Sequence, residues 1–428
     1  MADTFIPGSV AQWIEQRFSK PSMQVRFLPE SLNLFIMENF TIDIKKIKLI
    51  PKGVSDKFGM CVYGSLTDEI NDWINFHGMT IENKDSYTNI FTDKFLYDLF
   101  NSPKQIKYLD GFSPNLNKHL HIGHFSNLIL AKSFKSLGIS KETIAILGDT
   151  LQGEISKEKA LNSFKNICEN FEYKIDKIFF ASEMIFDKLL EDGEEEYAGT
   201  KIFKIGDDKI VGKKSDGTTS YFYQDVALAN HLNDSILYLT GSEQKQHFDL
   251  LKKIYPQTFH IGLGLVKANG VKMSSRLGNV IWMKEILDLL MEEFNNDEKL
   301  CYNIFAGLIL KSSPTSDKNI NLDQIKNPLN SPGLYLSYTL AKLKSAGVNI
   351  KNEIFKNQDL QFKHLKSIDS MMPNILLESL LEHAKKINAL YITHKIIGNK
   401  ENELIFSKLG SDLLYGMTLL GMFDIKRV

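Results

Sequence analysis

The chain has 428 residues and a formal net charge of −1; 43% of its residues are hydrophobic and 24% are charged. This length allows two or three domains with separate cores, and the balanced charge gives no overall basic signature for nucleic-acid binding. No apolar run approaches the length of a membrane span, and the three cysteines, more than a hundred residues apart, give no disulfide framework. We therefore expect a globular protein of the reducing cytoplasm that does not enter a membrane.

The first 36 residues differ in composition from the rest of the chain. They contain Arg17 and Arg26, two of only four arginines in a sequence that otherwise uses lysine. The stretch lacks the apolar core of a secretory signal. It resembles the peptide that results when a tRNA gene is translated, most clearly in GSVAQWIEQRFSKP. We predict that residues 1–36 are a non-native or disordered extension and that Met37 is the real start; an amphipathic N-terminal helix is the competing interpretation.

Three further regions follow in chain order. Residues 37–103 mix short β-like runs, such as IDIKKIKLI and GMCVYGS, with polar stretches, and we predict a small α+β region there. Residues 104–324 alternate apolar strands (IKYLDGF, ETIAILGD, SILYLTG) with helical segments, which is typical of α/β proteins with a doubly wound parallel sheet. Within this region residues 156–200 look helical. Residues 325–428 have helical periodicity almost throughout, which predicts an all-helical bundle.

The segment SPNLNKHLHIGH, residues 113–124, contains three histidines within six residues. A zinc site would need further ligands, and no cluster of cysteine or histidine lies nearby, so we expect no bound metal. The segment joins a predicted strand to a helix, with His121, Gly123 and His124 at the first helical turn. Backbone N–H groups and the helix dipole attract anions there, and glycine lets a phosphate approach closely. A phosphate site therefore fits this segment better than a metal site.

A second stretch, KMSSRLGN at residues 272–279, places small hydroxyl residues and glycine behind Lys272, a composition suited to a loop over a polyphosphate. HIGH at 121–124 and KMSSR at 272–276 resemble the two signature motifs of class I aminoacyl-tRNA synthetases. The runs SPNLNKHLHIGH, KKSDGTTSYFYQDVALA, YLTGSEQKQH and VKMSSRLGNVI narrow the resemblance to arginyl-tRNA synthetase, in order, from about residue 105 to the C-terminus. The resemblance implies a Rossmann-type catalytic sheet, a helical anticodon-binding domain and a shortened form of the enzyme, with a monomer as the family default.

For the nucleotide, the resemblance implies that ATP binds with Mg²⁺ as a substrate complex. His121 and His124 would stabilise charge that develops at the α-phosphorus, and Lys272 would hold the leaving pyrophosphate. Ser275 stands where many class I enzymes have a second lysine, and Lys118 matches the compensating lysine of arginyl enzymes. The implied catalytic residues are His121, His124, Lys118 and Lys272, and the implied ATP-binding residues are His121, Gly123, His124, Gly241, His247, Lys272, Met273, Ser274 and Ser275.

For the amino acid, a guanidinium needs carboxylates and planar acceptors, because its donors form a rigid fork. The positions that match the family's arginine pocket are Asp110, Ser113, Asn115, Tyr221, Asp225 and Gln244, with Asp225 as the expected ion-pair partner. Tyr335 and Tyr338 match aromatic positions of the anticodon-binding domain and would stack on bases of tRNA(Arg), although tyrosines at this spacing are more often core residues. The resemblance also implies that tRNA must be bound before arginine is activated.

Departures from the family pattern leave alternatives open. Gly111 and Phe112 stand where the family has an aromatic and then a small polar residue. We expect the Phe112 ring to lie beside the amino-acid pocket, where it would alter or block arginine binding. GDTLQGE at 148–154 lacks the usual tryptophan after Gly-Asp. The main interpretation is an arginine–tRNA ligase; the alternatives are a paralogous adenylate-forming ligase for another amino acid or acceptor, and a catalytically silent tRNA-binding protein.

Overall fold

The computed structural model describes residues 35–426 apart from 38–39, 43–46, 51–57, 64–65, 67–70, 73, 76–77, 85, 94–95, 97–104, 150–155, 185–194, 198, 206, 269, 273–279, 295–296 and 321–330. The predicted extension at residues 1–36 lies outside the described residues except for its last two positions. Within the described part of the chain, no helix is both long and apolar enough to cross a membrane.

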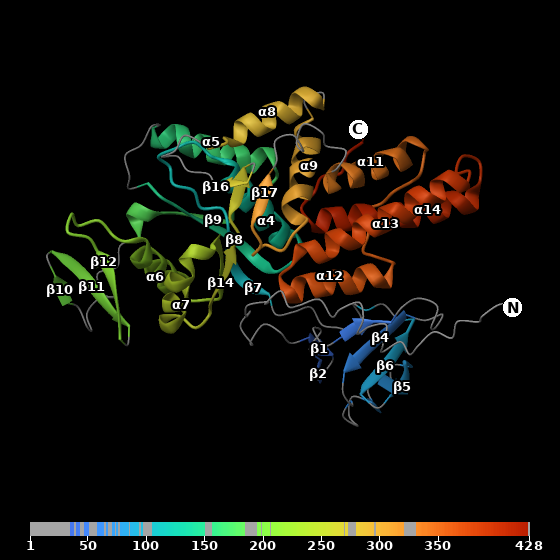
Figure 1. The fold of residues 1–428 in the computed structure, drawn as a ribbon, viewed down its shortest axis with the longest axis horizontal. Coiled ribbons are helices and arrows are strands. Elements are labelled where there is room, and N and C mark those ends of the chain that lie inside the picture. The colour runs from blue at the N-terminus through green and yellow to red at the C-terminus, as the bar shows by residue number, and fades with distance from the viewer. Residues whose placement is uncertain are drawn as a thin grey trace.

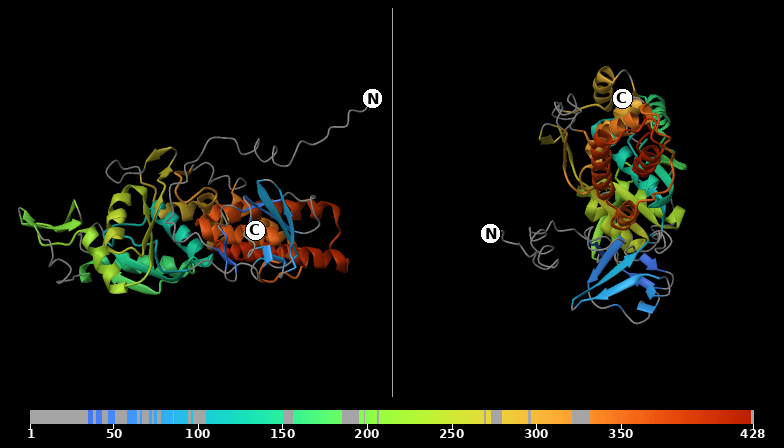
Figure 2. Two further views of the ribbon diagram at one scale, coloured as in Figure 1. Left: turned by 90° about the horizontal axis from the view of Figure 1, so that it is seen from below. Right: turned by 90° about the vertical axis from the view of Figure 1, so that its right-hand side faces the viewer.

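The N-terminal region contains short antiparallel strands. β1 (Phe35–Met37) pairs with β2 (Phe40–Ile42), and a second sheet has the strand order β3-β4-β6-β5. The strands of this second sheet are β3 (Ile47–Leu49), β4 (Phe58–Tyr63), β5 (Thr80–Asn83) and β6 (Tyr87–Thr92). The region lies against helix α12 (Gln358–Ser370), whose Gln361 side chain accepts a hydrogen bond from the Leu96 amide at 2.7 Å (Figures 1 and 2). The N-terminal region is therefore attached to the C-terminal helices.

The central sheet has five parallel strands in the order β14-β13-β7-β8-β9. They are β7 (Ile106–Asp110), β8 (Ser140–Leu147), β9 (Lys177–Phe180), β13 (Ile236–Gly241) and β14 (Thr258–Leu263). The chain runs outward from β7 to β9 and then returns to β13 on the other side of β7, so the winding reverses between β7 and β13. This order confirms the predicted doubly wound sheet. Ligands bind at such a reversal, beyond the carboxyl ends of the strands.

Helices cover both faces of this sheet because successive strand residues point to opposite sides. Leu109 and Leu239 join the hydrophobic cluster on one face, with α4 (Ile122–Ser136) and α5 (Lys157–Asn170). Tyr108 and Tyr238 join the cluster on the other face, with α6 (Tyr221–Leu232) and α7 (Lys245–Ile254). The cleft at the end of β7 and β13 therefore has walls from helices of both layers.

Residues 156–200 are not helical throughout, so that prediction was wrong. α5 ends at Asn170, and β9 then pairs in parallel with β8 at the edge of the sheet. β10 (Glu195–Tyr197) begins an antiparallel sheet with β11 (Thr200–Ile205) and β12 (Asp208–Lys213), which projects from one end of the molecule (Figure 1). Short apolar runs such as IFF in β9 fit either a helix or a strand. In this structure the pairing with β8 makes the segment a strand.

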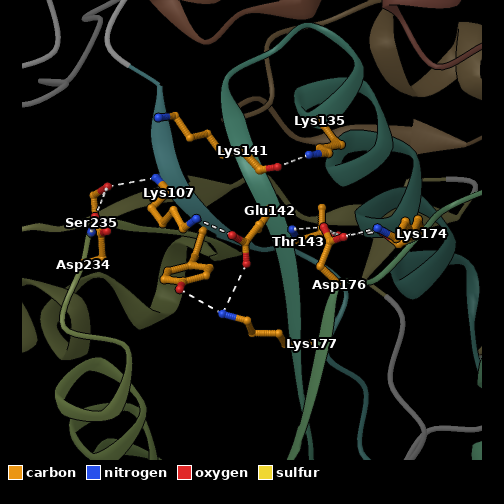
Figure 3. A network of polar contacts seen from close by, with 11 residues as sticks. Lys107, Lys135, Lys141, Glu142, Thr143, Lys174, Asp176, Lys177, Asp234 and Ser235 are labelled. Carbon is orange, nitrogen blue, oxygen red and sulfur yellow. Dashed lines mark hydrogen bonds and ion pairs between the residues drawn. The ribbon is translucent and has the colours of Figure 1, made fainter.

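Charged side chains link neighbouring strands near the amino ends of the sheet. Glu142 on β8 forms ion pairs with Lys107 on β7 and with Lys177 on β9, the latter at 3.3 Å (Figure 3). The Thr143 amide donates to the Asp176 carboxylate just before β9, at 2.9 Å. Exposed or half-exposed ion pairs add little stability each, so we interpret this network as a constraint on strand register.

Two helices and a small sheet connect the central sheet to the C-terminal region. The sheet has the order β16-β15-β17, with β15 (Val266–Ala268), β16 (Val271–Lys272) and β17 (Lys318–Ile320). The helices are α8 (Met283–Glu293) and α9 (Glu298–Leu310). The C-terminal region is then the predicted helical bundle, formed by α11 (Pro332–Ser345), α12, α13 (Pro373–Thr393) and α14 (Lys400–Leu419).

The bundle and the central sheet meet along α9. One hydrophobic cluster continues from α4 through α9 to α11, α13 and α14. A Cβ atom on Gly307 of α9 would lie 2.1 Å from the backbone nitrogen of Gly333 on α11, so these helices cross backbone to backbone. The buried Asn303 amide donates to the Ser337 hydroxyl at 3.0 Å and to the Phe423 carbonyl at 2.9 Å, and its oxygen accepts from the Phe423 amide at 2.8 Å. The junction is thus closely packed, and both polar atoms of the Asn303 side chain have partners there.

Candidate active site

A cleft of about 920 Å³ opens at the carboxyl ends of β7 and β13. Its walls come from the ends of both strands, the segment before α4, the first turns of α4 and α6, and the 3₁₀ helix Ser242–Gln244. The sequence-predicted residues that line it are Asp110, Ser113, Asn115, Lys118, His121, Gly123, His124, Tyr221, Asp225, Gly241, Gln244 and His247. Residues predicted for phosphate and for arginine therefore share one cleft.

The two histidines of the HIGH segment form the cap of α4. The Nδ1 atom of His121 accepts from the Gly123 amide at 3.1 Å, and Nδ1 of His124 accepts from the His121 amide at 3.1 Å. Their rings stack with centroids 3.8 Å apart. Because both Nδ1 atoms are acceptors, these hydrogen bonds assign the imidazole protons to Nε2. Each neutral ring keeps one N–H donor for a ligand.

The positive charge at this end of the cleft does not come from the histidines. Burial lowers the pKa of His121 to about 4, and the nearby Lys118 ammonium adds to the shift. Burial likewise lowers the pKa of His124 to about 3, with smaller contributions from His121 and Lys118. Both rings are therefore neutral at pH 7, and Lys118 with the amino end of α4 supplies the charge that attracts an anion.

Backbone hydrogen bonds bring the residues after the KMSSR motif to the HIGH segment. The Ile122 amide donates to the Ile281 carbonyl at 3.0 Å, and the Met283 amide donates to the Leu120 carbonyl at 3.1 Å. On the other side of the motif, Lys272 ends β16 and its backbone pairs with Lys267 on β15. The Lys272 side chain, Met273, Ser274, Ser275 and Arg276 lie outside the described residues. The flanks of the predicted loop are nevertheless fixed beside the cleft, because Val280 and Trp282 line it.

Asp110 is a buried carboxyl group at the end of β7. It is 4% exposed and accepts a very short hydrogen bond from the Ser113 hydroxyl, whose oxygen accepts in turn from the Ile146 amide at 3.0 Å. Burial raises the pKa of Asp110 to about 7; the Ser113 hydrogen bond opposes this shift and the Asp225 carboxylate adds to it. A carboxyl group in this position would ionise fully on meeting a cation.

Asp225 and His247, predicted to serve arginine and ATP respectively, contact each other. His247 Nε2 lies 2.7 Å from Asp225 Oδ2, and both side chains are largely buried. The Phe222 ring packs against the edge of His247 at 5.2 Å, which fixes the imidazole. Tyr221 lies at the rim and is 56% exposed. The pair therefore joins the two predicted subsites.

Asn115 lies against Gly148, the first residue of the divergent GDTLQGE segment. A Cβ atom at position 148 would be 1.8 Å from the Asn115 Oδ1 atom, so a side chain there would displace the Asn115 amide. The next residue, Asp149, accepts from the Ser182 amide at 2.8 Å and pairs with Lys157 at 2.5 Å. The rest of the segment lies outside the described residues. These contacts fix the residues that follow β8 at the edge of the cleft.

The prediction that Phe112 lies beside the amino-acid pocket was wrong. Phe112 is 1% exposed and stacks on Phe164 of α5 at 5.3 Å, on the side of the sheet away from the Asp110 carboxyl group, and it does not line the cleft. At Gly111 a Cβ atom would lie 2.8 Å from the Cβ atom of Ala131, so no aromatic ring fits at that position. The Phe112 side chain lies in the core and does not block the cleft.

The two tyrosines predicted for tRNA lie on α11, away from the cleft. Tyr338 is 51% exposed, with the Lys342 ammonium 5.8 Å from its ring centroid. Tyr335 packs partly against the core, and its hydroxyl accepts from Asn388 at 3.1 Å. Tyr338 is thus the one of the two that presents a ring to a ligand.

Sequence reasoning missed cleft residues that carry no motif of their own. Tyr238, Glu243 and Trp282 also line the cleft. Tyr238 and Glu243 fall in the YLTGSEQKQH run, and Trp282 follows the KMSSR motif, but neither run shows which way its side chains point. Among the described residues, no three His, Cys, Asp or Glu side chains form a metal-binding group.

The known proteins that this chain resembles in sequence include arginine–tRNA ligases. No protein-family model matches the sequence. The arginine–tRNA ligase of Oenococcus oeni is 29% identical over 261 residues, covering 49% of this chain and 46% of the relative, and that of Lactobacillus johnsonii is 25% identical over 300 residues, covering 59% and 54%. The chain thus spans about half the length of the curated relatives it matches.

Solved structures with the same fold include two arginyl-tRNA synthetases. The Thermus thermophilus protein has a TM-score of 0.60 at 14% identity and covers 89% of this chain and 96% of that one. The Plasmodium falciparum protein has a TM-score of 0.57 at 16% identity, with coverage of 88% and 96%. At such identities the likeness concerns the fold. The chain is thus similar to curated arginine–tRNA ligases over about half of its sequence, and it shares the fold of solved arginyl-tRNA synthetases.

Proposed function

We propose that the chain is an arginine–tRNA ligase. It would join ATP and arginine to form arginyl-adenylate and pyrophosphate, and then transfer the arginyl group to the 2′-hydroxyl of the terminal adenosine of tRNA(Arg). The observation that carries this proposal is the single cleft at the β7–β13 reversal, with neutral histidines and Lys118 at one end and two carboxyl groups on its sheet and α6. Such a cleft suits an anion and a cation held side by side.

At the anionic end, ATP would enter as its Mg²⁺ complex. The Nε2–H groups of His121 and His124 would donate to phosphate oxygens, and the Lys118 ammonium would balance the charge that builds when the arginine carboxylate attacks the α-phosphorus. The Gly123 backbone lets the phosphate approach, and Lys272 with the residues of its motif would hold the leaving pyrophosphate. Gly241 and His247 would support the adenosine.

At the cationic end, the guanidinium would pair with Asp225. Asp110, with Ser113, and the planar acceptors Asn115 and Gln244 would complete the recognition, and Tyr221 would close the rim. His247 would hold one Asp225 oxygen, which orients the carboxylate for the substrate. This arrangement supports arginine over an aliphatic amino acid, because a buried carboxylate without a cation is costly.

For the acceptor, Tyr338 on the bundle would stack on a base of tRNA(Arg), and Tyr335, which packs partly against the core, would support that surface. We further propose that the protein acts in the cytoplasm as a monomer. The Lys342 ammonium beside the exposed Tyr338 ring supports a contact with a polyanion.

ATP–pyrophosphate exchange with each of the twenty amino acids, with and without total tRNA, tests the proposal. We expect exchange with arginine alone, in the presence of tRNA. Exchange with another amino acid would indicate a paralogous ligase with an altered pocket. Absence of exchange in both arms, from protein shown to be folded by circular dichroism, would overturn the proposal in favour of a silent tRNA-binding protein.

A further inference from the structure

Tyr238 carries a buried hydroxyl group that has no role in the predictions above. It lies on β13, where its Cα atom is the register partner of Asp110 on the parallel strand β7. Register partners on adjacent strands point their side chains to the same face of the sheet, so the phenol and the Asp110 carboxyl group lie side by side. Tyr238 is 1% exposed and lines the cleft, and its ring packs against Phe248 with centroids 4.6 Å apart.

The Tyr238 hydroxyl has no hydrogen-bond partner in the protein. Five buried hydroxyl groups among the described residues lack a partner, those of Ser133, Ser140, Tyr173, Tyr238 and Tyr302, and of these only Tyr238 lines the cleft. A buried hydroxyl group costs free energy when its desolvation is not repaid, so one at the wall of a cleft points to a partner that arrives with a ligand. Burial, followed by the charges of Asp225 and Asp110, raises the pKa of Tyr238 well above its usual value. The hydroxyl therefore stays neutral and can both donate and accept.

Its surroundings select the chemistry of that partner. Both neighbouring carboxyl groups already have one contact each, Asp110 with Ser113 and Asp225 with His247. Two carboxyl groups facing one cleft favour a cation with several N–H donors in preference to an anion or a neutral group. A guanidinium has five such donors in one plane, so it can bind both carboxylates and still donate to a neutral oxygen.

We propose that Tyr238 is a specificity-determining residue for arginine: its hydroxyl oxygen accepts a hydrogen bond from the guanidinium of the bound amino acid, beside the carboxylates of Asp110 and Asp225. This inference rests on the proposed function, since it names a further contact in the same subsite. It assigns Tyr238 no part in the transfer chemistry.

The chain offers a matched control. Tyr302 on α9 is another fully buried tyrosine whose hydroxyl has no partner, but it does not line the cleft and its ring packs on Phe171 and Phe423 in the core. Substitution of either tyrosine by phenylalanine keeps the ring and removes one unpartnered hydroxyl. The thermal midpoint of the free protein should then stay the same or rise in both variants, because no hydrogen bond is lost.

The test is titration calorimetry of the full chain with arginine, citrulline and ATP, for wild type, Tyr238→Phe and Tyr302→Phe. We expect Tyr238→Phe to weaken arginine binding by about ten- to hundredfold, the usual size for a hydrogen bond to a charged group. Citrulline has no cationic fork, so its affinity should fall less than that of arginine in this variant. The ratio of arginine affinity to citrulline affinity should therefore decrease. ATP binding should be unchanged, and Tyr302→Phe should match wild type for all three ligands.

The outcomes separate the inference from the proposed function. If wild type and Tyr238→Phe bind arginine equally, the inference is overturned while the ligase proposal stands. An equal loss in Tyr302→Phe, or a lowered thermal midpoint of Tyr238→Phe with an unchanged arginine-to-citrulline preference, would reveal a packing effect and overturn it too. Wild type that binds ATP but not arginine would overturn the proposed function, and the inference with it.

Discussion

Two buried polar clusters in this molecule differ in how their hydrogen bonds are satisfied. At the junction of α9 with the bundle, Asn303 uses its amide nitrogen and oxygen on Ser337 and on both backbone groups of Phe423. In the cleft, the Tyr238 hydroxyl has no partner, and burial raises the pKa of Asp110 to about 7. The hydrogen bonds of the Asn303 side chain are complete without a ligand, whereas the Tyr238 hydroxyl has none.

The difference separates groups that stabilise the fold from groups that await a substrate. A satisfied buried network contributes to stability and loses much when one member is removed. An unsatisfied group contributes little or costs stability, and its removal should matter only once a ligand is present. The two clusters should therefore respond in opposite ways to substitution, and the following experiments test that contrast.

The largest effect is expected from Asp225→Ala. This change would leave the guanidinium of arginine and the His247 ring without their carboxylate, and should weaken arginine binding by about 3 kcal/mol or more. Calorimetric titration with arginine measures it, with Asp249→Ala as the control, because Asp249 belongs to an exposed ion pair with Lys245. An unaltered arginine affinity would exclude Asp225 from recognition.

Asn303→Ala should change the stability of the free protein and leave arginine binding largely unaffected. It leaves the Phe423 backbone groups and the Ser337 hydroxyl unpaired in the core, so the free energy of unfolding should fall by about 2–4 kcal/mol. Urea denaturation measures the change. Asn388→Ala is the matched control: Asn388 also bridges two helices, to Tyr335 and Thr339, but it is only half-buried and should cost less. A smaller loss for Asn303→Ala than for Asn388→Ala would contradict the interpretation of the junction.

Lys118→Ala should slow adenylate formation more than tenfold with little change in arginine affinity. The neutral His121 and His124 rings cannot replace the lost charge, whereas their hydrogen bonds to phosphate remain. Rapid-quench measurement of the first turnover separates this rate from product release. Lys135→Ala, at the opposite end of α4, is expected to behave as wild type. Equal rates for both variants would remove Lys118 from the phosphate site.

The pH dependence of arginine binding gives the smallest and most specific effect. If arginine binds to ionised Asp110, affinity should fall as pH decreases below about 7, by at most about tenfold per pH unit, and Asp110→Asn should abolish that slope. Stability should change in the opposite direction: a raised acid pKa favours the folded state at low pH, and this contribution is lost as pH rises from the ordinary value of 3.8 through about 7. Titrations at several pH values, and urea denaturation of both proteins, measure the two trends. A wild-type affinity independent of pH would contradict the role of Asp110.

The sequence could predict much of this architecture, because it depends on local patterns. Alternating strands and helices predicted the doubly wound sheet, and Gly138 after α4 has φ +82°, a conformation in which glycine commonly ends a helix. The motif residues could be assigned to one cleft because the family resemblance carries their positions. Their hydrogen bonds, including the Asp225–His247 pair, required the structure.

Side-chain direction and strand register could not be predicted from the sequence. Phe112 was expected beside the pocket, but its direction depends on where β7 ends, and one residue of shift moves a side chain to the other face. For the same reason the sequence did not identify Tyr238 as a cleft residue, because only the pairing of β7 with β13 places it beside Asp110. Such pairings join residues more than a hundred positions apart, and no local periodicity encodes them.

The glycine crossing of α9 and α11 has a consequence for long ligands. Neither Gly307 nor Gly333 has room for a side chain: a Cβ atom at Gly333 would lie 1.7 Å from the Asn303 carbonyl oxygen. Any replacement must therefore rotate the bundle about this crossing. Because displacement grows with distance from a pivot, a small rotation here becomes a larger shift at the far ends of α13 and α14. An RNA that spanned the cleft and the bundle would experience that shift, whereas a ligand held within the cleft alone would not.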